Sequence, residues 1–328
     1  MKKKLANVLL IVSAVGGFSH QALADPSTYP DRPIKVVIPQ APGGGTDIVG
    51  RLWASWVSKE IGGNVIVENR PGANGVIAAS YVKQQKNDGY TLLLAGVSQL
   101  AFNASMYKNL PYDVLNDFDG VALLANTPLM LVSSKASGLT DFGKFVAYGQ
   151  ANPGKLTYAT AGNGNSTHLA MAMLSKRLDL SMTHIPYNGS TAGLNSVVGA
   201  QTDVMFDVLN TAAVQAKAGK VNALVILGNK QEADLPDVPT IADVGLKDFP
   251  LPGWYGMVAP KNTPERIRVK LNDATQKFFA DPEIAARLRE LKMEPLPSQP
   301  TDVLAWAQRD AKVWGPLITE LGIANEVK

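Results

Sequence analysis

Short runs of β-branched and aliphatic residues alternate along the chain with longer segments in which apolar residues recur at helical spacing. The short runs predict strands at 34–38, 64–68, 90–95, 156–160, 182–187, 203–208 and 223–227. The longer segments predict helices at 47–61, 75–85, 140–150, 167–178, 192–199 and 212–218, with further helices between 264 and 321. Because strands that alternate with helices form βαβ units, we expect an α/β fold with largely parallel sheets.

Two segments interrupt the alternation and predict places where the chain crosses between domains. In the segment 118–134, residues 121–126 and 129–134 form one extended apolar stretch that is broken only by Thr127-Pro128. Residues 236–260 are rich in Pro and Gly. Two crossings imply a discontinuous first domain, because the chain must leave it and return. We therefore expect a first domain of residues 25–126 plus 247–328 and a second domain of residues 127–246.

The first 24 residues predict a cleavable secretory signal. Three lysines after the initial Met precede an apolar run over residues 5–17, and Ala22-Leu23-Ala24 forms a small-residue cleavage motif. The apolar run is shorter than the roughly 20 residues that a membrane-spanning helix needs. We therefore expect an exported protein that is cleaved after Ala24, in preference to a membrane anchor.

Removal of this segment changes the net charge of the chain. The 328-residue chain has 31 Lys and Arg against 28 Asp and Glu, so loss of the three leading lysines leaves 28 of each and no net charge. A neutral protein offers no long-range attraction for nucleic acid, and we expect no such partner. The absence of cysteine excludes disulfides and thiolate zinc sites. His168 and His184 are sixteen residues apart, which excludes a two-histidine helical zinc motif.

A glycine-rich loop follows the first predicted strand. Gly43, Gly44 and Gly45 lead into Thr46 and Asp47, and we expect Thr46 to cap a helix that starts at Asp47. Backbone N–H groups at the positive end of a helix bind anions, and glycines let a ligand approach the backbone closely. The alternative at this loop is a tight turn with no ligand.

Two further polar loops follow predicted strands in the second domain. The first of them consists of Gly162, Asn163, Gly164, Asn165, Ser166, Thr167 and His168. The second consists of Asn188, Gly189, Ser190 and Thr191. Open α/β sheets bind ligands at the carboxyl ends of their strands, so the three loops together predict one anion site.

Residue spacing excludes the common nucleotide-binding motifs. A dinucleotide fingerprint would need glycine at positions 48 and 167, which are Ile48 and Thr167. Neither loop is followed by the Gly-Lys-Ser or Gly-Lys-Thr of a phosphate-binding loop. We therefore expect a carboxylate-sized anion as the ligand, and no cofactor.

Four other residues each leave more than one interpretation open. Asp207 lies in an apolar strand, where it orients loop amides, meets a polar group of the ligand, or is a surface or capping residue. Asn103 either reaches the ligand from the first domain or lies on a helix surface. Trp254 and Tyr255, in the second crossing segment, either line a cleft or pack in the core.

Ser166 and His168 are two residues apart and raise the hypothesis of a serine hydrolase. A nucleophile elbow needs a second glycine two residues after the serine, and His168 occupies that position. We expect His168 to cap or donate at the start of a helix and the chain not to be an enzyme. A periplasmic hydrolase that uses Ser166 and His168 is the alternative.

Several longer segments resemble Bug-type receptors, the periplasmic solute-binding proteins of tripartite tricarboxylate transporters. These segments are residues 29–52, 67–79, 88–95, 156–170, 185–190 and 237–245. They occur in order with ordinary spacing, and the resemblance covers essentially the whole chain after the predicted signal.

The resemblance implies a two-lobed Venus-flytrap fold, in which each lobe is a βαβ sheet flanked by helices and two segments cross between the lobes. It implies a monomer that binds a small organic carboxylate by backbone amides and ordered water and delivers it to the membrane subunits of a transporter. A di- or tricarboxylate, an aromatic acid or an acidic amino acid all fit this description. The implied ligand-binding residues are 43–47, 162–168, Asn188, Gly189, Ser190 and Asp207. A sensor that presents its ligand to a signalling receptor is a further alternative.

Overall fold

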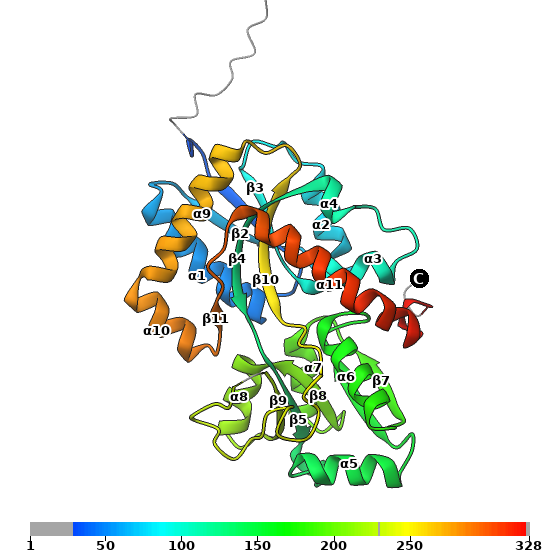
Figure 1. The fold of residues 1–328 in the computed structure, drawn as a ribbon. Helices are drawn as coiled ribbons and strands as arrows, with labels where there is room; N and C mark the ends of the chain where they lie inside the picture. The colour runs from blue at the N-terminus through cyan, green and yellow to red at the C-terminus, as the bar shows by residue number, and fades with distance from the viewer. Residues whose placement is uncertain (1–28, 229, 326–328) are drawn as a thin grey trace, which may run out of the picture.

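The computed structural model describes residues 29–228 and 230–325. The predicted signal and its cleavage site lie outside these residues. Figure 1 shows two lobes, each built on its own sheet and joined by extended strands that run between them. Within the described ranges, every helix is too short or too polar to span a lipid bilayer.

The first lobe is built on a six-stranded sheet with the order β11-β4-β10-β3-β1-β2. Its strands are β1 (Ile34–Ile38), β2 (Val65–Asn69), β3 (Thr91–Gly96), β4 (Phe118–Asn126), β10 (Trp254–Pro260) and β11 (Glu294–Pro295). Its helices are α1 (Gly45–Glu60), α2 (Val76–Lys83), α3 (Asn103–Met106), α4 (Val114–Asp117), α9 (Glu265–Ala280), α10 (Pro282–Glu290) and α11 (Pro300–Glu320). Helices α1, α9 and α10 bury one face of the sheet, and α2 and α11 bury the other.

The second lobe is built on a five-stranded sheet with the order β7-β6-β8-β5-β9. Its strands are β5 (Leu129–Ser134), β6 (Leu156–Thr160), β7 (Met182–Pro186), β8 (Val204–Val208) and β9 (Val221–Leu227). Its helices are α5 (Phe142–Ala151), α6 (Ser166–Arg177), α7 (Ser190–Val198) and α8 (Leu209–Lys217). Helices α5 and α6 cover one face, and α7 and α8 cover the other.

The sheets are mixed, so the expectation of largely parallel sheets was wrong. β1 pairs in parallel with β2 and β3, and β6 pairs in parallel with β7 and β8. Five of the nine pairings among the described strands are antiparallel, and they involve β4, β5 and β10. The reason is that the chain leaves the first lobe along β4 and returns along β10 in the opposite direction. Residues 254–260, expected to belong to a crossing segment, form an interior strand of the first sheet.

The two crossings lie side by side and are joined by a backbone hydrogen bond. Thr127, between β4 and β5, donates its N–H to the carbonyl oxygen of Gly253 at 2.8 Å. A Cβ at position 253 would lie 2.0 Å from the Thr127 carbonyl oxygen, so only glycine permits this approach. Phe249 still packs in the core of the second lobe. We propose that the lobe boundaries lie at Thr127 and between Phe249 and Trp254.

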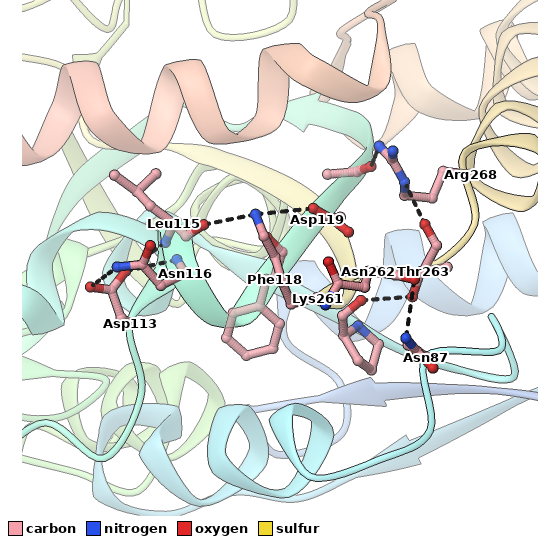
Figure 2. A network of polar contacts seen from close by, with 12 residues as sticks. Asn87, Asp113, Leu115, Asn116, Phe118, Asp119, Lys261, Asn262, Thr263 and Arg268 are labelled. Carbon is pink, nitrogen blue, oxygen red and sulfur yellow. Dashed lines mark hydrogen bonds and ion pairs between the residues drawn. The ribbon is translucent and has the colours of Figure 1, made fainter.

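Figure 2 shows how the returning chain is fastened to the first half of the first lobe. The Nζ of Lys261, just after β10, donates to the carbonyl oxygen of Leu115 at 3.1 Å and pairs with the carboxylate of Asp119 at 3.2 Å. The side-chain amide of Asn87 donates to the carbonyl oxygen of Asn262 at 3.1 Å. Segments about 150 residues apart in sequence therefore share one lobe.

Replacement of Gly253 by Ala is expected to destabilise the protein, because the new methyl group would force the two crossings apart. We expect the free energy of unfolding, measured by urea denaturation, to fall by about 1–3 kcal/mol. Gly143→Ala is the control, since Gly143 is exposed near the start of α5 and a Cβ there meets only Asp141 Oδ1 at 3.4 Å. Equal stability of the two variants would contradict the tight approach at the crossing.

Candidate functional site

A cavity of about 860 Å³ lies between the two lobes. Its walls are the loops that follow β1, β2 and β3 in the first lobe and β6 and β7 in the second. None of the lining residues, all within the described part of the chain, is Lys, Arg, His, Asp or Glu. Attraction for an anion must therefore come from backbone and neutral side-chain dipoles.

Most of the residues that the sequence predicted for the ligand site line this cavity. They are Gly44, Gly45, Thr46, Gly162, Asn163, Asn165, Ser166, Thr167, Asn188, Gly189 and Ser190. The others are not among the lining residues, and these are Gly43, Asp47, Gly164, His168 and Asp207. The titratable members of this second group hold the loops in place, as described below.

The first loop is held by the side chain of Asp47. Its carboxylate accepts the N–H of Gly43 at 3.0 Å, the Nδ2 of Asn69 at 2.9 Å and the Nε of Arg51 at 3.0 Å. Burial opposes ionisation of Asp47, but these donors outweigh it and hold the pKa below its usual value. The expected cap at Thr46 was wrong: α1 begins at Gly45. The helix therefore starts two residues earlier than expected, with Gly44 at its N-cap.

The second loop is held by two side chains at the start of α6. The Oδ1 of Asn165 accepts the N–H groups of Thr167 at 2.9 Å and His168 at 3.2 Å, so Asn165 caps the helix. The Nδ1 of His168 accepts the N–H of Gly164 at 3.0 Å. His168 was expected to cap or donate at the helix start, and here its Nδ1 acts as an acceptor.

His168 and His184 meet face to face although they lie on α6 and β7. Their ring centroids are 3.9 Å apart, and the rings are nearly parallel. The Nε2 of His184 hydrogen-bonds the hydroxyl of Thr160 at 2.7 Å. Burial lowers the pKa of His168 to about 3, with a further contribution from His184, and lowers the pKa of His184 to about 4. Both rings are therefore neutral at physiological pH and serve as packing groups behind the loop.

The third loop is held by Asp207 on β8. The hydroxyl of Ser190, the first residue of α7, donates to its Oδ1, and the hydroxyl of Thr211 donates to its Oδ2 at 2.5 Å. Asp207 has no exposed surface, and this burial raises its pKa to about 6 against the opposing effect of the hydroxyl donors. Asp207 neither lies at the surface nor lines the cavity, and it orients the start of α7 through the hydroxyl of Ser190.

Residues 71–75 and 98–99 form a further wall of the cavity that the sequence patterns did not predict. Ala73 and Asn74 have φ of 46° and 48°, a left-handed conformation that is uncommon outside glycine. Asn103 stabilises this loop from behind, because its Nδ2 donates to the carbonyl oxygen of Asn74 at 3.2 Å. The Pro-Gly and Asn-Gly pairs at 71–72 and 74–75 were the available signal, since such pairs mark special turns.

Gln40, Tyr107 and Tyr187 also line the cavity, and the sequence did not predict them. Both interpretations of Trp254 and Tyr255 hold, because these side chains line the cavity and also pack in the core of the first lobe. Tyr255 is the second residue of β10, beside the crossings. A Cβ at Gly45 would lie 2.5 Å from the Tyr255 hydroxyl, so this ring packs directly against the start of α1.

The lobes touch each other around the cavity. The N–H of Ser166 in the second lobe donates to the hydroxyl of Ser98 in the first at 3.1 Å. Lys292, before β11, pairs with Glu232 of the second lobe at 2.9 Å and with Asp234 at 2.5 Å. The structure therefore represents an arrangement in which the two walls are in contact.

Three helices begin at the cavity: α1 from the first lobe and α6 and α7 from the second. Each helix start carries partial positive charge. The starts of α1 and α7 have no side-chain cap, whereas the first three N–H groups of α6 already donate to Ser98 and Asn165. Their convergence from two lobes allows the cavity to surround one anionic group with neutral donors.

Acidification from pH 7 to pH 5 is expected to lower the free energy of unfolding. The folded pKa values of His168 and His184 lie below the ordinary value of 6.5, so the unfolded chain takes up protons at these two residues in this range that the folded chain does not. Asp207, whose pKa is raised to about 6, acts in the opposite direction, but it is one group against two. His168→Asn retains an acceptor for the N–H of Gly164 and should reduce the loss between pH 7 and pH 5 by about 2 kcal/mol. Urea unfolding at several pH values measures this difference. Parallel pH profiles for the two proteins would show that His168 is protonated in the folded state.

Comparisons with known proteins agree with this geometry. Residues 49–323 match a family described as "Tripartite tricarboxylate transporter family receptor". Protein BugT of Bordetella pertussis is 31% identical, with 97% of this chain and 98% of BugT covered.

Among solved structures, periplasmic binding protein BugD is similar with a TM-score of 0.84 and 32% identity, and the match covers 90% of this chain and 99% of BugD. MatC, a Rhodopseudomonas palustris protein with bound malate, is similar with a TM-score of 0.82 and 32% identity, and the match covers 88% of this chain and 100% of MatC. A second protein from R. palustris, with adipate, is similar with a TM-score of 0.86 and 28% identity, and the match covers 90% of this chain and 98% of that protein.

These matches confirm the two-lobed fold that the sequence resemblance implied. The family and its structural neighbours are solute-binding receptors, which also confirms the expectation that the chain is not an enzyme. The chain belongs to the family of tripartite tricarboxylate transporter receptors.

Proposed function

We propose that this protein captures a small organic carboxylate in the cavity between its lobes, in the periplasm, and delivers it to the membrane subunits of a tripartite tricarboxylate transporter. The observation that carries the proposal is the convergence of the starts of α1, α6 and α7 on a cavity without charged side chains. The structural neighbours with adipate and malate support a carboxylate as the bound group.

Neutral donors suit a receptor that must release its ligand. Several N–H groups can share one carboxylate, and each such hydrogen bond is strengthened by the charge of the acceptor. A buried Lys or Arg would add a stronger attraction, but it would stay behind as an unpaired charge when the ligand leaves. The cavity avoids this state, because its walls remain neutral when it is empty.

The size of the cavity supports an indirect mode of binding. A volume of about 860 Å³ is large for a molecule such as malate, so ordered water would fill the remaining space. We propose that backbone amides bind the carboxylate both directly and through such water molecules. Water-mediated hydrogen bonds are nearly as favourable in enthalpy as direct ones.

Closure of the two walls on a ligand would create the surface that the membrane subunits recognise. In the present arrangement the contacts between Ser98 and Ser166, and between Lys292 and Asp234, join the two lobes. A ligand that touches both walls favours this arrangement by its differential affinity. We propose that a single closed monomer is the form that docks on the transporter.

Addition of a carboxylate that binds the cavity is expected to raise the melting temperature of the mature protein, because the ligand binds only the folded state. A panel of mono-, di- and tricarboxylates, aromatic acids and acidic amino acids, tested by thermal shift and confirmed by calorimetry, identifies the ligand. Gly44→Leu should abolish the shift. Gly44 lines the cavity at φ −81°, and a Cβ there meets no atom closer than 3.9 Å, so the chain tolerates the leucine while its side chain occupies the site.

Gly143→Leu is the matched control for this variant, since it adds the same side chain at an exposed position on α5. The control should keep the melting shift of the original protein. Equal shifts in Gly44→Leu and in the control would place the bound acid outside the cavity and contradict the proposal.

A further inference from the structure

Hydrogen bonds hold both the backbone and the side chain of Gln40 in the wall of the cavity. Its carbonyl oxygen accepts the Nδ2 of Asn69 at 3.0 Å, and Asn69 is tied in turn to Asp47. Its side-chain Nε2 donates to the Oε1 of Gln99 at 3.3 Å. Both Gln40 and Gln99 line the cavity, from the loops after β1 and β3.

Two backbone groups determine the orientation of the Gln99 side-chain amide, because one of them can only donate a hydrogen bond and the other can only accept one. The N–H of Gly96 can only donate, and it donates to the Oε1 of Gln99 at 3.2 Å. The carbonyl oxygen of Asn74 can only accept, and it accepts the Nε2 of Gln99 at 2.9 Å. The two ends of the Gln99 amide therefore cannot be exchanged.

This orientation determines that of Gln40. Because the Gln99 atom facing Gln40 is an acceptor, Gln40 must present its Nε2 there and keep its Oε1 for another partner. The Oε1 of Gln40 is buried and has no hydrogen-bond partner among the described residues. Buried polar atoms in folded proteins are paired almost without exception, so this oxygen marks a place for an absent donor.

We propose that Gln40 reads a hydrogen-bond donor on the bound ligand, and that the ligand is a hydroxy- or amino-substituted carboxylate rather than an unsubstituted one. This inference rests on the proposed function, because it assumes a carboxylate at the helix starts. The starts of α1 and α7 supply N–H donors and the start of α6 adds partial positive charge, which suits a carboxylate but cannot discriminate a hydroxyl from a hydrogen beside it.

Gln40 supplies the complementary acceptor. Gln40 lines the cavity and its side chain as a whole is only partly buried, so its amide is within reach of a ligand held there. A site with a dedicated hydrogen-bond partner for a substrate group rejects analogues that lack the group, because its own polar atom is then left unpaired. Gln40 is thus a specificity-determining residue for the capture step.

The test compares acids that differ by one hydroxyl group. Calorimetry with malate and succinate, with citrate and tricarballylate, and with 2-hydroxyglutarate and glutarate gives an affinity ratio for each pair. We expect the hydroxy acid of the pair that fits the cavity to bind at least about tenfold more tightly, which corresponds to about 1.4 kcal/mol. Equal affinity within every pair that binds would overturn the inference and leave the proposed function standing. If no carboxylate binds, both are wrong.

Gln40→Met should reduce the ratio to near one, because methionine fills a similar volume without an acceptor. The affinity for the unsubstituted acid should change little, which separates loss of recognition from loss of the site. Gln40→Ala provides a second measurement of the same ratio if methionine disturbs the loop. Gln201→Met, at an exposed position between α7 and β8, is the control and should keep the original ratio. A ratio that survives both replacements of Gln40 would overturn the proposal.

Discussion

The architecture depends on one constraint, which is that the chain crosses between the lobes twice and that the crossings touch. The hydrogen bond from Thr127 to Gly253 joins them at a position where any side chain on residue 253 would collide with the backbone. Because β4 and β10 are neighbours in the first sheet, the direction of one determines that of the other. The mixed sheets and the discontinuous first lobe follow from this junction, as does the position of Tyr255 between the junction and the start of α1.

The site uses charged and titratable side chains to shape its walls and keeps them away from its ligand. Asp47 fixes the first loop, His168 the second and Asp207 the third, and none of them lines the cavity. The polar groups that line the cavity are backbone, hydroxyl and amide groups, and they lie beside apolar side chains such as Leu129 and Trp254. This division allows charge-assisted hydrogen bonds to make the loops rigid while the cavity itself remains neutral.

Local patterns predicted the helices that begin at the cavity to within about two residues, because strand, glycine-rich loop and helix start are encoded in neighbouring residues. They predicted neither the antiparallel pairing of β10 nor the cavity wall at 71–75, since both depend on contacts between distant segments. The sequence placed Asp207 and His168 near the loops, but only burial shows that they support the loops from behind. The unpaired oxygen of Gln40 is visible only once Gln99, 59 residues away, is oriented by its neighbours.

The interior position of β10 also constrains the order in which the protein can be assembled. The second lobe is a continuous segment whose five strands are all made before residue 254. The first sheet, in contrast, has a gap between β3 and β4 until β10 emerges, and α9, α10 and α11 are needed afterwards to cover its faces. A chain that is synthesised or translocated from its N-terminus therefore keeps the first lobe incomplete until nearly its last residues are available. The half of the binding site that contains Gln40 is thus the last to form.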